Sequence, residues 1–114
     1  MSLPQLDETK YPCFIKTKDQ NPMLVVVMHD GQRFQLPYYH FLGGQYRPKK
    51  DNKSEIYTLE FSLHIVGITG ANLLFLAEAI DEMKVRLIRP AAEGTPQSEV
   101  RVTHIEVACR HGDG

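Results

Sequence analysis

Apolar and polar residues alternate most regularly between residues 57 and 65. Tyrosine, leucine, phenylalanine, leucine and isoleucine fill the odd positions, and threonine, glutamate, serine and histidine fill the even ones. Because successive side chains of a strand point to opposite faces of a sheet, this period of two predicts a strand with one buried and one solvent-exposed face. Gly67, just beyond it, predicts a bulge or a bend.

An uninterrupted apolar run over residues 23–28 gives a second strand signal. Its three consecutive valines favour an extended chain, and the lack of alternation indicates burial on both faces. The Asp30-Gly31 pair that follows predicts a tight hairpin turn into a return strand over residues 33–36.

Shorter segments complete the sheet pattern. Gly43-Gly44 predicts a bulge or sharp bend, and a shift of apolar parity near Thr103-His104 predicts another irregularity. The polar residues 47–54 and the breaker-rich residues 90–99 predict loops. Further strands are expected at residues 13–18, 38–42, 85–88 and 100–109.

Helical spacing replaces alternation after Gly70. Apolar residues recur on one face of a helix over residues 72–84, and acidic residues lie opposite. Asn72 predicts the N-cap, because its side-chain oxygen can accept a hydrogen bond from an amide of the first turn.

These elements predict an α+β fold. We expect a strongly bent antiparallel sheet or small open barrel of five or six strands, covered by one helix at about 72–84. Residues 1–114 are expected to form a single domain, with flexible ends at residues 1–12 and 110–114.

Composition narrows the functional classes only slightly. The formal net charge is −1. The overall charge therefore predicts neither a nucleic-acid-binding protein nor an acidic solvating tail. We interpret Cys13 and Cys109 as buried reduced thiols, although a disulfide between the two ends is also compatible with the sequence. No apolar run suits a membrane helix and no signal segment is evident, so we expect a cytoplasmic protein without membrane contact.

The titratable residues form no recognised catalytic motif. The five histidines lack metal-ligand spacing, and His64 and His104 would meet only if their strands pair. Glu60, Ser62 and His64 share a strand face, but about 13 Å would separate Glu60 from His64, too far for a hydrogen bond in a hydrolase triad. We therefore predict no catalytic residue, no metal site and no cofactor.

Basic residues concentrate in one loop. Lysine and arginine can contact phosphates, and a neighbouring aromatic ring can stack on a base. The sequence therefore predicts a candidate nucleic-acid site made of Tyr46, Arg47, Lys49, Lys50 and Lys53.

Two large apolar residues lie on the polar side of the predicted helix. Leu74 and Phe75 fall near the acidic residues rather than on the apolar face. Two adjacent residues of this size predict either a helix sandwiched between two layers or a subunit interface.

Two segments together resemble the Sm/Lsm-like family of small β-barrels. Residues 24–41, LVVVMHDGQRFQLPYYHF, are similar to the Sm1 pattern, and residues 66–76, VGITGANLLFL, are similar to the Sm2 pattern. The RNA-contacting Asp-x-x-x-Asn of the family is not evident in residues 38–42, and Thr69 stands where its Arg-Gly pair has arginine. The resemblance implies a strongly bent sheet and ring oligomers joined by edge strands.

The combined features favour a non-catalytic, oligomeric binding module of Sm-like shape that contacts RNA through the basic loop. The expected partners are further copies of the chain and RNA. Two alternatives stay open. One is a protein-interaction or structural subunit that uses Leu74, Phe75 and a free sheet edge. The other is an enzyme of unknown class that uses His64 and His104.

Overall fold

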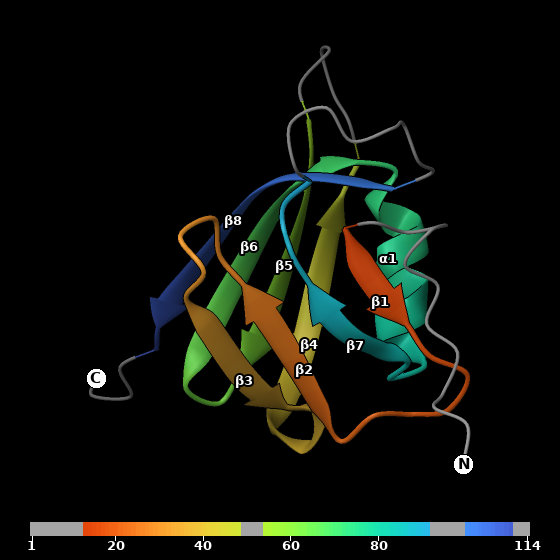
Figure 1. The fold of residues 1–114 in the computed structure, drawn as a ribbon, viewed down its shortest axis with the longest axis vertical. Coiled ribbons are helices and arrows are strands. Elements are labelled where there is room, and N and C mark those ends of the chain that lie inside the picture. The colour runs from red at the N-terminus through yellow and green to blue at the C-terminus, as the bar shows by residue number, and fades with distance from the viewer. Residues whose placement is uncertain (1–12, 49–53, 92–99, 111–114) are drawn as a thin grey trace.

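The chain folds as two β-sheets with one α-helix beside them (Figure 1). A computed structural model describes residues 13–48, 54–91 and 100–110. Its elements are β1 (Phe14–Lys16), β2 (Met23–Val27), β3 (Arg33–Pro37), the 3-10 helix η1 (Tyr38–His40), β4 (Phe41–Arg47), β5 (Glu55–Phe61), β6 (His64–Ala71), α1 (Leu73–Asp81), β7 (Val85–Ile88) and β8 (Arg101–Cys109).

Each sheet has four strands. The first has the order β1-β7-β2-β3, in which β2 and β7 are parallel and the other pairs antiparallel. The second has the order β4-β5-β6-β8 and is antiparallel throughout. The α+β prediction is therefore confirmed. The expectation of one antiparallel sheet or barrel of five or six strands is wrong, because the described residues form eight strands in two open sheets.

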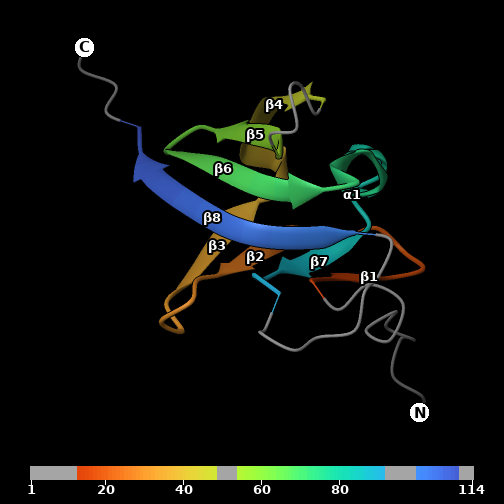
Figure 2. The same cartoon turned by 90° about the horizontal axis from the view of Figure 1, so that it is seen from above.

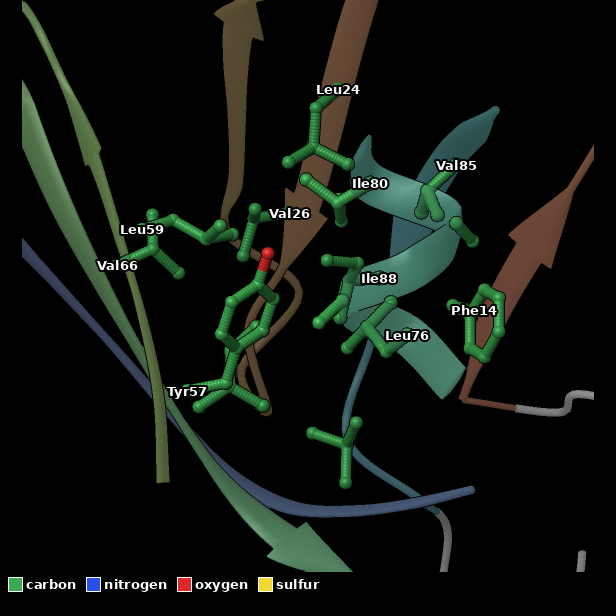
Figure 3. Close-up of a cluster of buried hydrophobic side chains, with 14 of the residues drawn as sticks. Phe14, Leu24, Val26, Tyr57, Leu59, Val66, Leu76, Ile80, Val85 and Ile88 are labelled. Atoms are coloured by element: carbon green, nitrogen blue, oxygen red, sulfur yellow. The ribbon is translucent and has the colours of Figure 1, made fainter. Parts of the chain in front are cut away.

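The core lies between the two sheets and the inward face of α1 (Figures 2 and 3). Each layer contributes side chains that are almost completely removed from water, and burial of one large apolar side chain stabilises the fold by about 1.5–3 kcal/mol. The buried residues include Phe14, Leu24, Val26, Tyr57, Leu59, Val66, Leu76, Ile80, Val85 and Ile88.

The predicted strand over residues 57–65 is two strands. β5 ends at Phe61 and β6 begins at His64, so Ser62 and Leu63 form a turn and Leu63 is 63% exposed. Two tertiary hydrogen bonds hold this turn. The Ser62 amide donates to the carbonyl of His40 at 3.0 Å, and the Arg110 amide donates to the carbonyl of Leu63 at 2.7 Å. Both partners are distant in sequence, so the local alternation could not reveal the turn.

The predicted hairpin after the valine run is confirmed. β2 and β3 pair from Met23↔Pro37 to Val27↔Arg33, and Gly31 has φ +88°, which a residue with a side chain rarely adopts. Burial on both faces is wrong for this run, because burial alternates along β2 and only Leu24 and Val26 are fully buried.

β4 begins later and continues further than the sequence predicted. Residues 38–40 form η1, so only the last part of the expected 38–42 strand is extended. β4 then passes through the glycine pair to Arg47, with the predicted bulge lying between Phe41 and Gly43. Gly43, at the bulge, has φ +150°, which a residue with a side chain rarely adopts.

The second predicted irregularity is also present. Thr69 pairs with His104 and Gly70 with Val102, so Thr103 is the extra residue of a bulge in β8. A side chain at Gly70 would collide with the backbone carbonyl of Arg101. The bulge predicted at Gly67 is wrong, since the register is regular there.

The helix is shorter than the predicted 72–84 segment. It spans Leu73–Asp81, because Met83 adopts φ +59° and its amide donates to the carbonyl of Ile80 at 2.8 Å. The Lys84 amide reaches back to Ala79 at 3.0 Å, which completes a Schellman-type end. Asn72 occupies the N-cap position, but its side chain makes no capping hydrogen bond.

Several sequence predictions lie outside the described residues. These are the flexible ends, apart from Arg110, most of the loop at 90–99, and Lys49, Lys50 and Lys53. Both cysteines are free; Cys13 is buried as predicted, whereas Cys109 is exposed at the end of β8. No helix in the described ranges has the length and apolar character needed to cross a bilayer.

Candidate functional surfaces

A buried carboxylate organises the junction of β4, β5 and α1. Glu55, the first residue of β5, is only 9% exposed. Its Oε2 accepts a hydrogen bond from the Asn72 amide at 2.7 Å, and its Oε1 accepts one from the Leu73 amide at 2.8 Å. Glu55 therefore supplies the N-terminal cap that the sequence analysis assigned to Asn72. The negative charge of Glu55 also interacts favourably with the positive, N-terminal end of the helix dipole.

The same carboxylate fixes Tyr46. The Tyr46 hydroxyl donates to Glu55 Oε1 at 2.7 Å, and this hydrogen bond to a carboxylate raises the pKa of Tyr46 above its usual value. Three elements distant in sequence thus converge on one side chain, which sets the position of the first turn of α1.

The predicted nucleic-acid site is divided by this geometry. Tyr46 pairs with the buried Tyr57, whereas Arg47 pairs with Ile56, so consecutive side chains of β4 point to opposite faces of the sheet. The Tyr46 ring lies on the core side and Arg47 on the outer side. The role of Tyr46 and Arg47 in nucleic-acid binding stays a prediction, as does that of the three lysines that follow them.

The outer face of the second sheet carries a shallow hollow of about 350 Å³. It lies over β6, where Gly67 has no side chain and an added Cβ would meet nothing within 4 Å. Strand register places Thr58 and Glu106 on either side of Gly67. The lining residues are Ile56, Thr58, Ile65, Gly67, Thr69, His104, Glu106 and Ala108.

The two histidines of the enzyme hypothesis do not meet. His64 pairs with Cys109 and His104 with Thr69, so they occupy opposite ends of the β6–β8 ladder. The ring of His64 contacts Phe34 at 5.8 Å between centroids, and His104 Nε2 lies 3.2 Å from Glu106 Oε1. Among the described residues, no group of three or more His, Cys, Asp or Glu side chains could hold a metal ion.

The outward face of α1 combines apolar and acidic residues. Leu74 and Phe75 are 49% and 47% exposed, as their place on the polar side of the helix predicted. Glu78, Asp81 and Glu82 continue this face toward the end of the helix and are exposed. We call these five residues the α1 outer face.

Among the described residues, few positive charges neutralise the acidic end of the α1 outer face. The nearest recorded ion pair joins Lys84 Nζ to Glu82 Oε2 at 3.9 Å, a distance and exposure at which an ion pair contributes little. Asp81 also lies close enough to Tyr57 to add to the raised pKa of that buried tyrosine, which burial mainly causes. The face therefore presents two large apolar side chains beside three carboxylates.

The chain matches no protein-family model. No curated protein and no solved structure matches it significantly either. The resemblance to Sm/Lsm-like proteins accordingly stays a prediction.

Glu55 is the residue that the sequence analysis missed. From the sequence, a glutamate at the start of a strand is expected to be an ordinary solvated charge, and the helix that Glu55 caps begins 18 residues later. The pairing of Glu55 with Gly70 in the β5–β6 ladder is what brings the carboxylate to the helix. Only knowledge of the Ser62-Leu63 turn would have revealed that register.

Proposed function

We propose that this domain is a non-catalytic protein-interaction module that docks a partner segment on the α1 outer face. The observation that carries the proposal is the side-by-side exposure of Leu74 and Phe75 on a helix whose opposite face is fully packed. An exposed aromatic side chain such as Phe75 is typical of a protein interface, and Leu74 extends the apolar area beside it.

The charge of this face specifies the chemistry of the partner. Three carboxylates follow the apolar pair within two helical turns, so a complementary segment would carry apolar residues flanked by lysine or arginine. A basic amphipathic helix is such a segment, because it presents one apolar stripe between positive flanks.

A second copy of α1 is a poor occupant of this face. In an isologous contact the same patch meets itself, which would bring the carboxylates of both copies into one interface. Like charges brought together in an interface are costly. The charge pattern therefore favours a different, basic partner over pairing of two α1 helices.

RNA contact receives less support from the described residues than protein contact. The hollow on the outer sheet face is lined by threonine, isoleucine, glycine and alanine with His104 and Glu106, and by no Phe, Tyr or Trp ring. Binding of single strands normally needs aromatic rings on which bases stack. The Tyr46 ring, which would serve that purpose, lies on the core side of β4.

The proposal can be tested with a fluorescein-labelled synthetic helix of leucine and lysine residues and its Leu/Glu counterpart. Fluorescence anisotropy should show saturable binding of the basic peptide and none of the acidic one. Phe75→Ser and Glu78→Lys should each weaken binding at least about tenfold, as expected for an interface anchor and for reversed charge complementarity.

Glu106→Lys is the matched control. It makes the same charge change on β8, at a side chain that is 78% exposed. Equal affinity in this control and in wild type is expected. If Glu106→Lys weakens binding as much as Glu78→Lys does, the peptide senses only net charge and the assignment of the α1 outer face is wrong.

A further inference from the structure

The four sheet edges are protected to different degrees. β1 has only three residues, and β3 carries Arg33 at one end and Pro37 at the other. In β8, the Val102 carbonyl already accepts a hydrogen bond from the Ala91 amide at 2.7 Å, and charged side chains follow along the strand. Short length, charge and proline are the devices that keep edge strands from pairing with other chains.

β4 carries such devices only at its ends, as a bulge between Phe41 and Gly43 and a charge at Arg47. Gly43 to Tyr46 contains no charged residue and no proline, and β4 is seven residues long. Apart from the Phe41 amide, which donates to the carbonyl of Tyr38, the backbone of β4 pairs only with β5 among the described residues. Figure 2 shows β4 at the end of its sheet, with no labelled element beyond it. The bulge is confined to the start of the strand, and the register with β5 continues without a shift from Gly43 to Arg47.

We propose that two copies of the chain pair antiparallel through β4, across a two-fold axis centred on Gln45. This pairing would join the two β4-β5-β6-β8 sheets into one continuous sheet. A register centred on a residue keeps the core side and the outer side of both sheets aligned, because side chains alternate with a period of two.

Steric complementarity favours this register. Tyr46 of each copy would lie opposite Gly44 of the other, and Arg47 opposite Gly43. Each large side chain therefore faces a glycine, so no two bulky side chains compete for the same space. Gln45 would face its own copy, where the two amides can exchange hydrogen bonds.

Charge complementarity also favours it. Gly43 pairs with Glu60 on β5, on the outer face of the sheet. Arg47 of one copy would therefore lie two strands, about 10 Å of backbone, from Glu60 of the other. Since Gly43 has no side chain between them, the long guanidinium can reach that carboxylate. Glu60 is 51% exposed, and its recorded partner, Arg110, contacts one of its two oxygens at 3.2 Å.

Sedimentation velocity over a range of protein concentrations tests the pairing. Wild type should show a reversible monomer–dimer equilibrium. Gln45→Lys should weaken dimerisation at least about tenfold, because it places two positive charges directly opposite each other at the axis. Gln35→Lys is the matched control, since Gln35 is an exposed residue of β3, an edge strand of the other sheet, and it should leave the dimer unchanged.

A charge-reversal pair tests the register. Arg47→Glu and Glu60→Arg should each weaken the dimer, and the double variant should recover much of the loss. Circular dichroism at low concentration should show that all variants keep the native fold, because each replaced side chain is exposed.

Three results would overturn the proposal. The first is a wild-type protein that stays monomeric at about 1 mM. The second is a dimer that Gln45→Lys and Gln35→Lys affect equally. The third is an open-ended series of oligomers, which indicates heterologous rather than two-fold contacts. The anisotropy assay separates this proposal from the partner site, since Gln45→Lys should bind the basic peptide like wild type.

Discussion

Replacement of Glu55 by glutamine tests the anchoring of α1 to the second sheet. Among the described residues, the Tyr46 hydroxyl and the amides of Asn72 and Leu73 donate hydrogen bonds to the carboxylate at 2.7–2.8 Å. Glutamine keeps the shape but replaces one acceptor oxygen with a donor. The side-chain NH2 group of the glutamine would then face the hydrogen of the Tyr46 hydroxyl or of a helix amide, and that hydrogen bond could not form.

The expected loss follows from the bonds involved. A hydrogen bond to a charged group contributes about 1.5–3 kcal/mol, and one is lost outright. Loss of the charge beside the helix N-terminus adds about 0.3–1 kcal/mol. We therefore expect Glu55→Gln to lower the free energy of unfolding by about 3 kcal/mol, and Tyr46→Phe, which removes only the hydroxyl, by about 2 kcal/mol.

Urea unfolding followed by circular dichroism measures these differences. Glu106→Gln serves as the control, because its side chain is exposed and contacts only His104 among the recorded interactions, and we expect a change below about 0.5 kcal/mol. If Glu55→Gln unfolds at the same urea concentration as this control, Glu55 does not anchor the helix.

Three further variants or conditions probe the fold. Gly70→Ala should be destabilising by about 3 kcal/mol or more in urea unfolding, because its Cβ would strike the β8 backbone, whereas Gly67→Ala, with open space around its Cβ, should be neutral or stabilising; equal effects would contradict the β6–β8 register. Burial raises the pKa of Tyr38 and Tyr57 above the usual 10.0, so the folded state keeps protons that the unfolded chain loses. Stability should be intact below pH 10 and should fall above it by up to about 1.4 kcal/mol per pH unit per tyrosine, and urea midpoints that are flat from pH 9 to 11 would refute this. Cys109 should react at once with a thiol reagent and the other cysteine only on unfolding; two fast thiols in the native protein would contradict the burial.

Local signals predicted much of the fold. The Asp30-Gly31 turn, the apolar face of α1 and the bulge at Thr103 are each encoded within a few consecutive residues, and each was found. The exposed pair Leu74 and Phe75 was also predicted by helical geometry alone. In each of these cases, the residues that form the structural element are the same residues whose pattern in the sequence predicts it.

Features that depend on distant contacts were not predictable. The Ser62-Leu63 turn interrupts a perfect alternation because two backbone groups from elsewhere in the chain hold it. Met83 ends the helix in a left-handed conformation that the sequence would assign to glycine. The cap of α1 comes from another strand. In each case tertiary hydrogen bonding overrides the local preference, and no nearby residue signals it.

The most direct test of the account is the site at which a basic amphipathic peptide binds. Titration of the ¹⁵N-labelled protein with the Leu/Lys peptide should shift the amide resonances of Leu74, Phe75, Glu78 and Asp81 and leave the outer face of the second sheet unchanged. Shifts centred on Gly67 instead would contradict the assignment of the interaction surface to α1.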